Sequence, residues 1–216
     1  MGQSHLMDRF MTLCDWVYRL SILQLLWFVF TLLGGIVLGI FPATAALFAS
    51  LRKLQNGESI HLLSTFVKAY RAEFWKSQQL GYLYLCTGLF IYIDLLLLIS
   101  YQHPVAMIGI VLFTSLFILF LSASMYVFPI YAHFRMTLGT MIKLSFFLAV
   151  TQPLLTLGMA LGTVLIYCIL WFIPGLQLFL SISVFCFVYM KLASIGFEKI
   201  QKSGFIKDRY EAELGA

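Results

Sequence analysis

Long apolar stretches make up most of this sequence and limit how the chain can fold. Four of them, Gln78–Ile99, Val105–Phe128, Leu144–Ile173 and Gly175–Ile195, are as long as the roughly 20 residues that one helix needs to cross a bilayer. Charged residues make up only 11% of the 216 residues, whereas a soluble domain carries about 25%. We therefore predict an all-α fold, a polytopic bundle of transmembrane helices surrounded by lipid.

A fifth apolar region, Trp16–Leu51, can be divided in two ways. As one helix it would be about 54 Å long, which exceeds a hydrocarbon core of roughly 30 Å unless the helix is strongly tilted. The pair Gly34-Gly35 offers a break, which would give two passes, Trp16–Leu33 and Ile36–Leu51. The chain is therefore expected to have five or six spans, and we prefer six.

The distribution of lysine and arginine predicts the orientation of the spans. Basic residues occur in Arg52–Lys76, around Arg135 and in the tail after Lys191, whereas Ser100–Pro104 and Pro174–Gln177 contain none. These basic and non-basic links alternate along the chain, as cytoplasmic and outer loops should. We therefore expect a cytoplasmic C-terminus.

The number of passes decides where the N-terminus lies. Two passes in the N-terminal region place Arg9 and Arg19 inside with the other basic residues, so that six spans leave both termini cytoplasmic. One pass would leave both arginines outside. The segment Ile36–Leu51 contains Gly39 and Pro42, so it can also be broken or re-entrant, which requires that protein or water satisfies the freed backbone groups.

We treat residues 1–216 as a single membrane domain with two cytosolic additions. The first is an amphipathic helix over about 58–76, in which apolar residues recur at Leu63, Val67, Tyr70 and Phe74 with helical spacing. Such a helix either lies on lipid headgroups or docks onto a partner. The second is a tail over about 196–216, which continues the last helix.

Two polar side chains at membrane depth are candidates for function. Asp94 is the one acid inside a clear span, and a carboxylate in lipid is costly. It can be a structural anchor near the outer face, an ion or proton relay, or a partner contact. Gln152 precedes Pro153, which should kink or break its helix, and Gln152 either bonds a neighbouring helix or contacts a substrate.

Motifs for enzymatic chemistry are absent from the sequence. It contains no H-E-x-x-H, no G-x-S-x-G and no G-x-x-x-x-G-K-[ST]. The histidines are scattered, so we expect no metal site and no cofactor. The basic residues do not form one polar face, so we expect no binding to nucleic acid. We therefore predict a protein that is not an enzyme.

The segment Ile36–Lys53 reads IVLGIFPATAALFASLRK, and Phe66–Ser77 reads FVKAYRAEFWKS. Both resemble the YesL-like family of bacterial integral membrane proteins, whose defining domain has no known function. The resemblance marks one set of residues as family signature or candidate partner interface. These are Pro42, Thr44, Ala45, Phe66, Tyr70, Phe74 and Trp75.

Members of this family are encoded near genes for carbohydrate uptake, often beside ABC importers for oligosaccharides. The resemblance therefore implies a non-enzymatic accessory or assembly subunit that contacts membrane lipid and the permease subunits of such an importer. The alternative is an independent small transporter or channel. That alternative requires a polar pathway along facing helices, touching Asp94 and Gln152.

Overall fold

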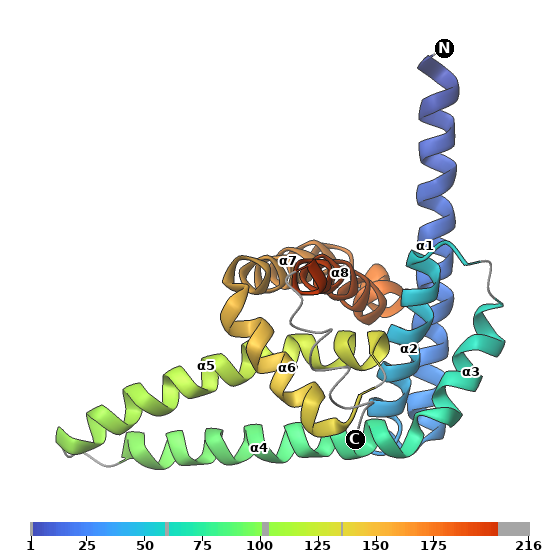
Figure 1. Cartoon of the computed structure of the whole chain (residues 1–216). Coiled ribbons are helices and arrows are strands. Elements are labelled where there is room, and N and C mark those ends of the chain that lie inside the picture. Colours follow the sequence, from blue (N-terminus) through green and yellow to red (C-terminus); the bar gives the residue numbers. More distant parts are fainter. Residues whose placement is uncertain (1, 59–60, 101–103, 135, 203–216) are drawn as a thin grey trace. The chain divides into compact units, whose positions relative to one another are not determined.

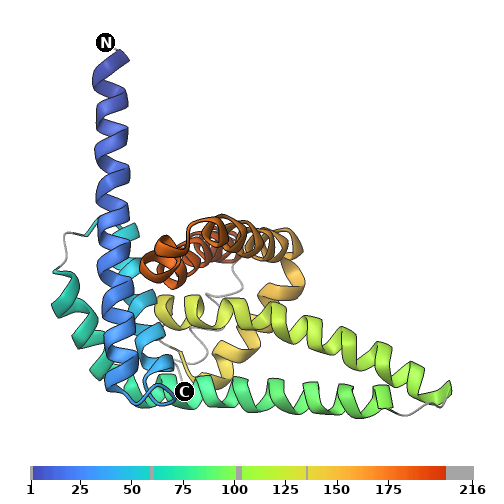
Figure 2. The ribbon, with the colours of Figure 1, turned by 180° about the vertical axis from the view of Figure 1, so that it is seen from behind.

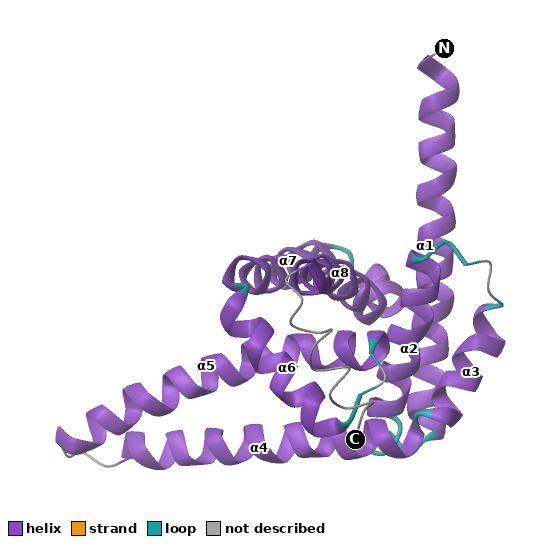
Figure 3. Ribbon diagram, in the orientation of Figure 1, coloured by secondary structure: helices purple, strands orange, loops and turns teal. Residues whose placement is uncertain are grey.

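The computed structural model describes residues 2–58, 61–100, 104–134 and 136–202, and every regular element within them is an α-helix (Figure 3). Five of these helices are long and apolar enough to cross a membrane. The prediction of a polytopic helical membrane protein is confirmed. The helices are α1 (Gly2–Leu33), α2 (Ile40–Gln55), α3 (Leu62–Ala72), α4 (Phe74–Ser100), α5 (Pro104–His133), α6 (Leu138–Thr151), α7 (Pro153–Phe172) and α8 (Pro174–Lys202).

Helix α2 occupies the place of the preferred sixth pass but is not one of the five long apolar helices. Its 16 residues would span about 24 Å, less than the hydrocarbon core. Residues 36–39 lie in a turn before it, and its side chains Ala43, Leu47 and Leu51 are fully buried by protein. The count of five is within the predicted range, whereas the preference for six is not supported. A cytoplasmic N-terminus depended on that preference and stays a prediction.

Both expected helix breaks are present. The chain turns after Leu33, where Gly35 has φ of +73°, a left-handed conformation that glycine adopts without strain. Ile36 follows with φ of +58°, which is unusual for a β-branched residue. At the second break α6 ends at Thr151 and α7 begins at Pro153, because proline lacks the N–H that would continue the helix.

The helices form two compact units. The first unit contains Met1–Gln79 and Leu161–Val188. Within it, α2 and α3 lie alongside the C-terminal half of α1, and the N-terminal half of α1 extends beyond them (Figures 1 and 2). Helix α8 contributes a buried bond, in which the Ser183 N–H donates to Gln24 Oε1 over 2.9 Å.

The second unit contains Leu80–Ala160 and Tyr189–Ala216. Its core lies where α5, α6, the start of α7 and the end of α8 meet. Helix α8 reaches Lys202, so the first part of the predicted tail is helical, and 203–216 lie outside the described residues. The core residues are Ala123, Tyr126, Ile130, Phe134, Met141, Leu144, Leu148, Ala149, Met159, Ala193 and Phe197.

Candidate functional site

The signature residues of α2 pack this helix against α1. Pro42 lies in the first turn of α2, where its missing N–H is tolerated, and it is fully buried, as is Ala45. The Thr44 hydroxyl accepts a hydrogen bond from Trp27 Nε1 over 3.1 Å and donates to the Ile40 carbonyl over 2.6 Å. The small residues allow close approach of the two helices, and the threonine fixes their register.

The turn between α1 and α2 is closely packed. A Cβ added to Gly39 would lie 2.3 Å from the Thr31 carbonyl oxygen, and one added to Gly34 would lie 2.4 Å from the Gly39 Cα. The Gln78 amide at the start of α4 donates to the Leu38 carbonyl. The turn is thereby tied to the beginning of the second long apolar helix.

Two aromatic side chains of α3 are buried against α1, whereas Leu63 of the same helix is 60% exposed. Phe66 is fully buried, and its ring centroid lies 5.5 Å from that of Phe30 in α1. Tyr70 is buried beside it and donates its hydroxyl proton to the Phe30 carbonyl over 3.3 Å. Burial raises the pKa of the Tyr70 phenol above its ordinary value. Phe66 and Tyr70 therefore position α3 and are not free to contact a partner.

Phe74 and Trp75 belong to α4 and not to the amphipathic helix expected over about 58–76. Helix α3 ends at Ala72, and Glu73 forms a bend before α4 begins. The ring of Phe74 contacts both Tyr70 and Trp75, each with a centroid distance of 5.7 Å. Trp75 is 77% exposed. It is the most exposed residue of the candidate interface set.

Asp94 lies two turns before the C-terminal end of α4 and is partly exposed. Nearby, the ring of Tyr92 contacts that of Phe117 in α5, with centroids 6.2 Å apart. No ion pair or hydrogen bond of Asp94 is recorded within the described ranges, which do not include 101–103. The roles suggested for Asp94 therefore remain predictions.

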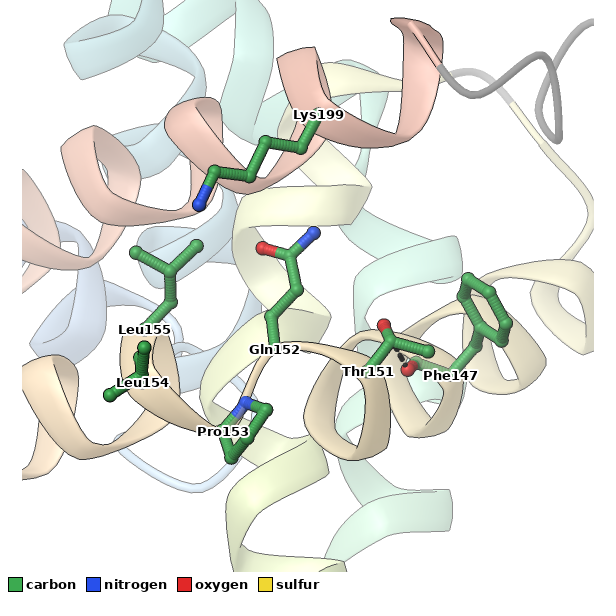
Figure 4. Close-up of a pocket in the computed structure, with 7 residues that line it drawn as sticks. All are labelled: Phe147, Thr151, Gln152, Pro153, Leu154, Leu155 and Lys199. Carbon is green, nitrogen blue, oxygen red and sulfur yellow. Dashed lines mark hydrogen bonds between the residues drawn. The ribbon is translucent and has the colours of Figure 1, made fainter.

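Gln152 lies in the break between α6 and α7, beside a cavity of about 380 Å³ in the second unit (Figure 4). Its side-chain amide donates from Nε2 to the Gly196 carbonyl of α8 over 3.1 Å, as expected for a residue that bonds a neighbouring helix. Asp94 does not line this cavity, whereas Lys199 of α8 does. The structure therefore brings Gln152 together with a cation and not with the acid of α4.

Sequence reasoning missed Lys199 and the bond between Gln24 and Ser183. Lys199 lies far from Gln152 in the chain, as Ser183 does from Gln24, so no spacing in the sequence could have paired them. Lys199 stands one turn after Gly196, but the close approach of Gly196 to Gln152 is visible only in the folded structure. Among the described residues no group of three or more His, Cys, Asp or Glu side chains is placed to hold a metal ion.

Comparison with known proteins identifies the family. A model described as a protein of unknown function, DUF624, matches residues 20–95, which include the signature of α2 and the aromatic residues of α3 and α4. YteU of Bacillus subtilis is 35% identical over 92% of this chain and 89% of its own length. YesL of the same organism is 33% identical over 88% of this chain and 90% of its own length. YesV, also of Bacillus subtilis, is 32% identical over 87% of this chain and 91% of its own length.

All three relatives are described as uncharacterized, so they supply no activity. No solved structure matches the chain. The resemblance to YesL that was read from the segments around Pro42 and Tyr70 extends over most of the chain. This protein therefore belongs to the YesL-like family that is defined by the DUF624 domain.

Proposed function

We propose that this protein is a non-enzymatic accessory or assembly subunit of a carbohydrate ABC importer in the bacterial cytoplasmic membrane. Its apolar helices suit a lipid environment. The sequence has no nucleotide-binding motif, so any use of ATP would come from a partner. The association of the family with genes for oligosaccharide uptake supports the choice of partner.

The exposure of the Trp75 side chain is the observation that supports this proposal most strongly. Its ring rests on Phe74, which in turn contacts the buried Tyr70, so an exposed aromatic side chain stands on a rigid base. Tryptophan is enriched among the residues that dominate binding energy at protein interfaces. The exposed Arg71 and Lys76 beside it favour a partner surface that carries acidic groups.

Co-purification from native membranes tests the proposal. The tagged protein is extracted in a mild detergent, and co-eluting permease subunits are quantified by mass spectrometry. We expect permease subunits with the wild type and their loss with Trp75→Ala. Phe172→Ala is the matched control, because Phe172 is 84% exposed at the end of another long apolar helix, and it should retain the partner.

Two results would contradict the proposal. In the first, the wild type elutes without permease subunits and deletion of its gene leaves oligosaccharide uptake intact. In the second, both variants keep the partner equally, which would reduce Trp75 to one of the aromatic residues common at membrane surfaces.

The transporter alternative rests on Asp94 and Gln152. Figures 1 and 2 both show the distal end of the α4–α5 hairpin, near which Asp94 lies, projecting away from α6. The two polar residues thus do not share the cavity at Gln152. Flux of an oligosaccharide through proteoliposomes of the purified protein, lost in Asp94→Asn, would favour this alternative over an accessory role.

A further inference from the structure

The cavity beside Gln152 is formed where α8 crosses the break between α6 and α7. A Cβ added to Gly196 would lie 2.8 Å from Gln152 Oε1 and 3.3 Å from Leu155 Cδ1, so the absence of a side chain at 196 allows this close crossing. Lys199 follows one helical turn later and therefore lies on the same face of α8. In Figure 4 the side chain of Gln152, from the break between α6 and α7, and the side chain of Lys199, from α8, extend into the same space.

The polar groups of this cavity require two different partners. The Lys199 ammonium is exposed and attracts an anion. Gln152 Oε1 is buried and has no hydrogen-bond partner among the described residues, so it needs a donor. The amino end of α7 adds partial positive charge, but the carboxyl end of α6 opposes it, so Lys199 supplies most of the attraction for an anion. A ligand that fits must carry both a negative charge and a hydroxyl or N–H group.

The location of the cavity adds a third requirement. Pro153 begins one membrane-spanning helix, Pro153–Phe172, and Lys199 ends another, Gly175–Lys199. The cavity therefore lies at an edge of the membrane, at the depth of lipid headgroups. Leu154 and Leu157 project outward beside it, and Leu154 is 83% exposed. A ligand here has apolar neighbours on its membrane side and polar neighbours at its head.

We propose that this cavity binds the headgroup of an anionic, hydroxyl-bearing phospholipid such as phosphatidylglycerol. The phosphate contacts Lys199, a headgroup hydroxyl donates to Gln152 Oε1, and the acyl chains lie along Leu154 and Leu157. Soluble glycerol phosphate presents the same head chemistry. The apolar neighbours favour the lipid source, and the experiment below distinguishes the two.

Binding is measured on the purified full chain in nanodiscs of phosphatidylcholine that contain increasing amounts of phosphatidylglycerol. Retained lipid is counted by native mass spectrometry, and the melting temperature is recorded in parallel. We expect tight retention by the wild type and a loss of affinity of about tenfold or more in Lys199→Gln, since one charge-assisted hydrogen bond is removed. Lys191→Gln is the matched control, because Lys191 is also exposed on α8 and does not line the cavity.

The role of Gln152 is tested by changing the lipid headgroup, because the substitution Gln152→Met removes a helix contact and can impair folding. Phosphatidylpropanol carries the same singly charged phosphodiester without the headgroup hydroxyls, so it should bind the wild type more weakly than phosphatidylglycerol. Equal binding of the two lipids would overturn the proposed hydroxyl contact. Equal losses in Lys191→Gln and Lys199→Gln would overturn the site itself.

Soluble competitors decide the source of the phosphate. Glycerol 3-phosphate or inorganic phosphate is added to the protein in discs of phosphatidylcholine alone, to measure stabilisation, and in discs that also contain phosphatidylglycerol, to measure displacement. We expect neither to stabilise the protein or to displace retained phosphatidylglycerol at millimolar concentration. Stabilisation by either one that depends on Lys199 would overturn the assignment to a lipid and identify a soluble phosphate ligand.

Discussion

The substitution Gly39→Ala tests the packing of the turn between α1 and α2. Gly39 has φ of −86° and ψ of −28°, a conformation that alanine adopts freely, so the effect of the added methyl group is steric. That methyl would lie 2.3 Å from the Thr31 carbonyl oxygen and 2.8 Å from its Cα. Both are backbone atoms of α1 and cannot rotate away, so α1 and α2 must separate.

Overpacking of this kind costs about 1–3 kcal/mol, and a contact with backbone belongs at the upper end. For a protein of this size 1 kcal/mol corresponds to roughly 2–4 °C in melting temperature, so we expect a fall of about 4–12 °C. The assay is thermal unfolding in detergent, followed by fluorescence-detected size-exclusion chromatography.

Gly139→Ala is the matched control for Gly39→Ala. Gly139 lies in the first turn of α6, and an added Cβ would have no neighbour within 4 Å. Alanine there should leave stability unchanged or raise it by about 0.5–1 kcal/mol, because glycine is the poorer helix former. If the two alanine variants melt at the same temperature, the close crossing at Gly39 is refuted.

Two further predictions concern the same unit. Removing the hydrogen bond between Trp27 and Thr44 should cost about 1 kcal/mol of stability. In a double-mutant cycle, the variant with both Trp27→Phe and Thr44→Val should therefore lose less stability than the sum of the two single losses. Additive losses of melting temperature would show that the bond contributes nothing. Burial raises the pKa of the Tyr70 phenol, so its contribution to stability is complete below the ordinary value of 10.0 and is lost as pH rises past the higher pKa of the folded state. Above pH 10.0 the wild type should therefore lose stability relative to Tyr70→Phe, and a constant difference across this pH range would contradict the burial of the phenol.

The sequence predicted the long helices well, because length and hydropathy alone define them. The expected spans Gln78–Ile99 and Gly175–Ile195 lie within α4 and α8. The breaks at Gly34-Gly35 and Pro153 were also correct, since each depends on a local property, the left-handed conformation of glycine or the missing N–H of proline.

The failures arise where tertiary packing decides. Periodicity placed Leu63, Val67, Tyr70 and Phe74 on one face of a helix, but it could not show that Tyr70 packs on α1 while Leu63 stays exposed. Hydropathy likewise could not distinguish a helix buried by protein from one buried by lipid, so α2 was preferred as a sixth pass. Lys199 could be assigned to the site at Gln152 only once the crossing of α8 was known.

The most direct test of the account is whether α4 crosses the membrane with its basic end inside. In a variant without the four native cysteines, single cysteines are introduced at Lys76 and Ser100, near opposite ends of this helix. Intact cells are treated with a maleimide that does not cross the membrane. We predict labelling of Ser100→Cys at once and of Lys76→Cys only after permeabilisation. Labelling of both without permeabilisation, or of Lys76→Cys alone, would contradict the account.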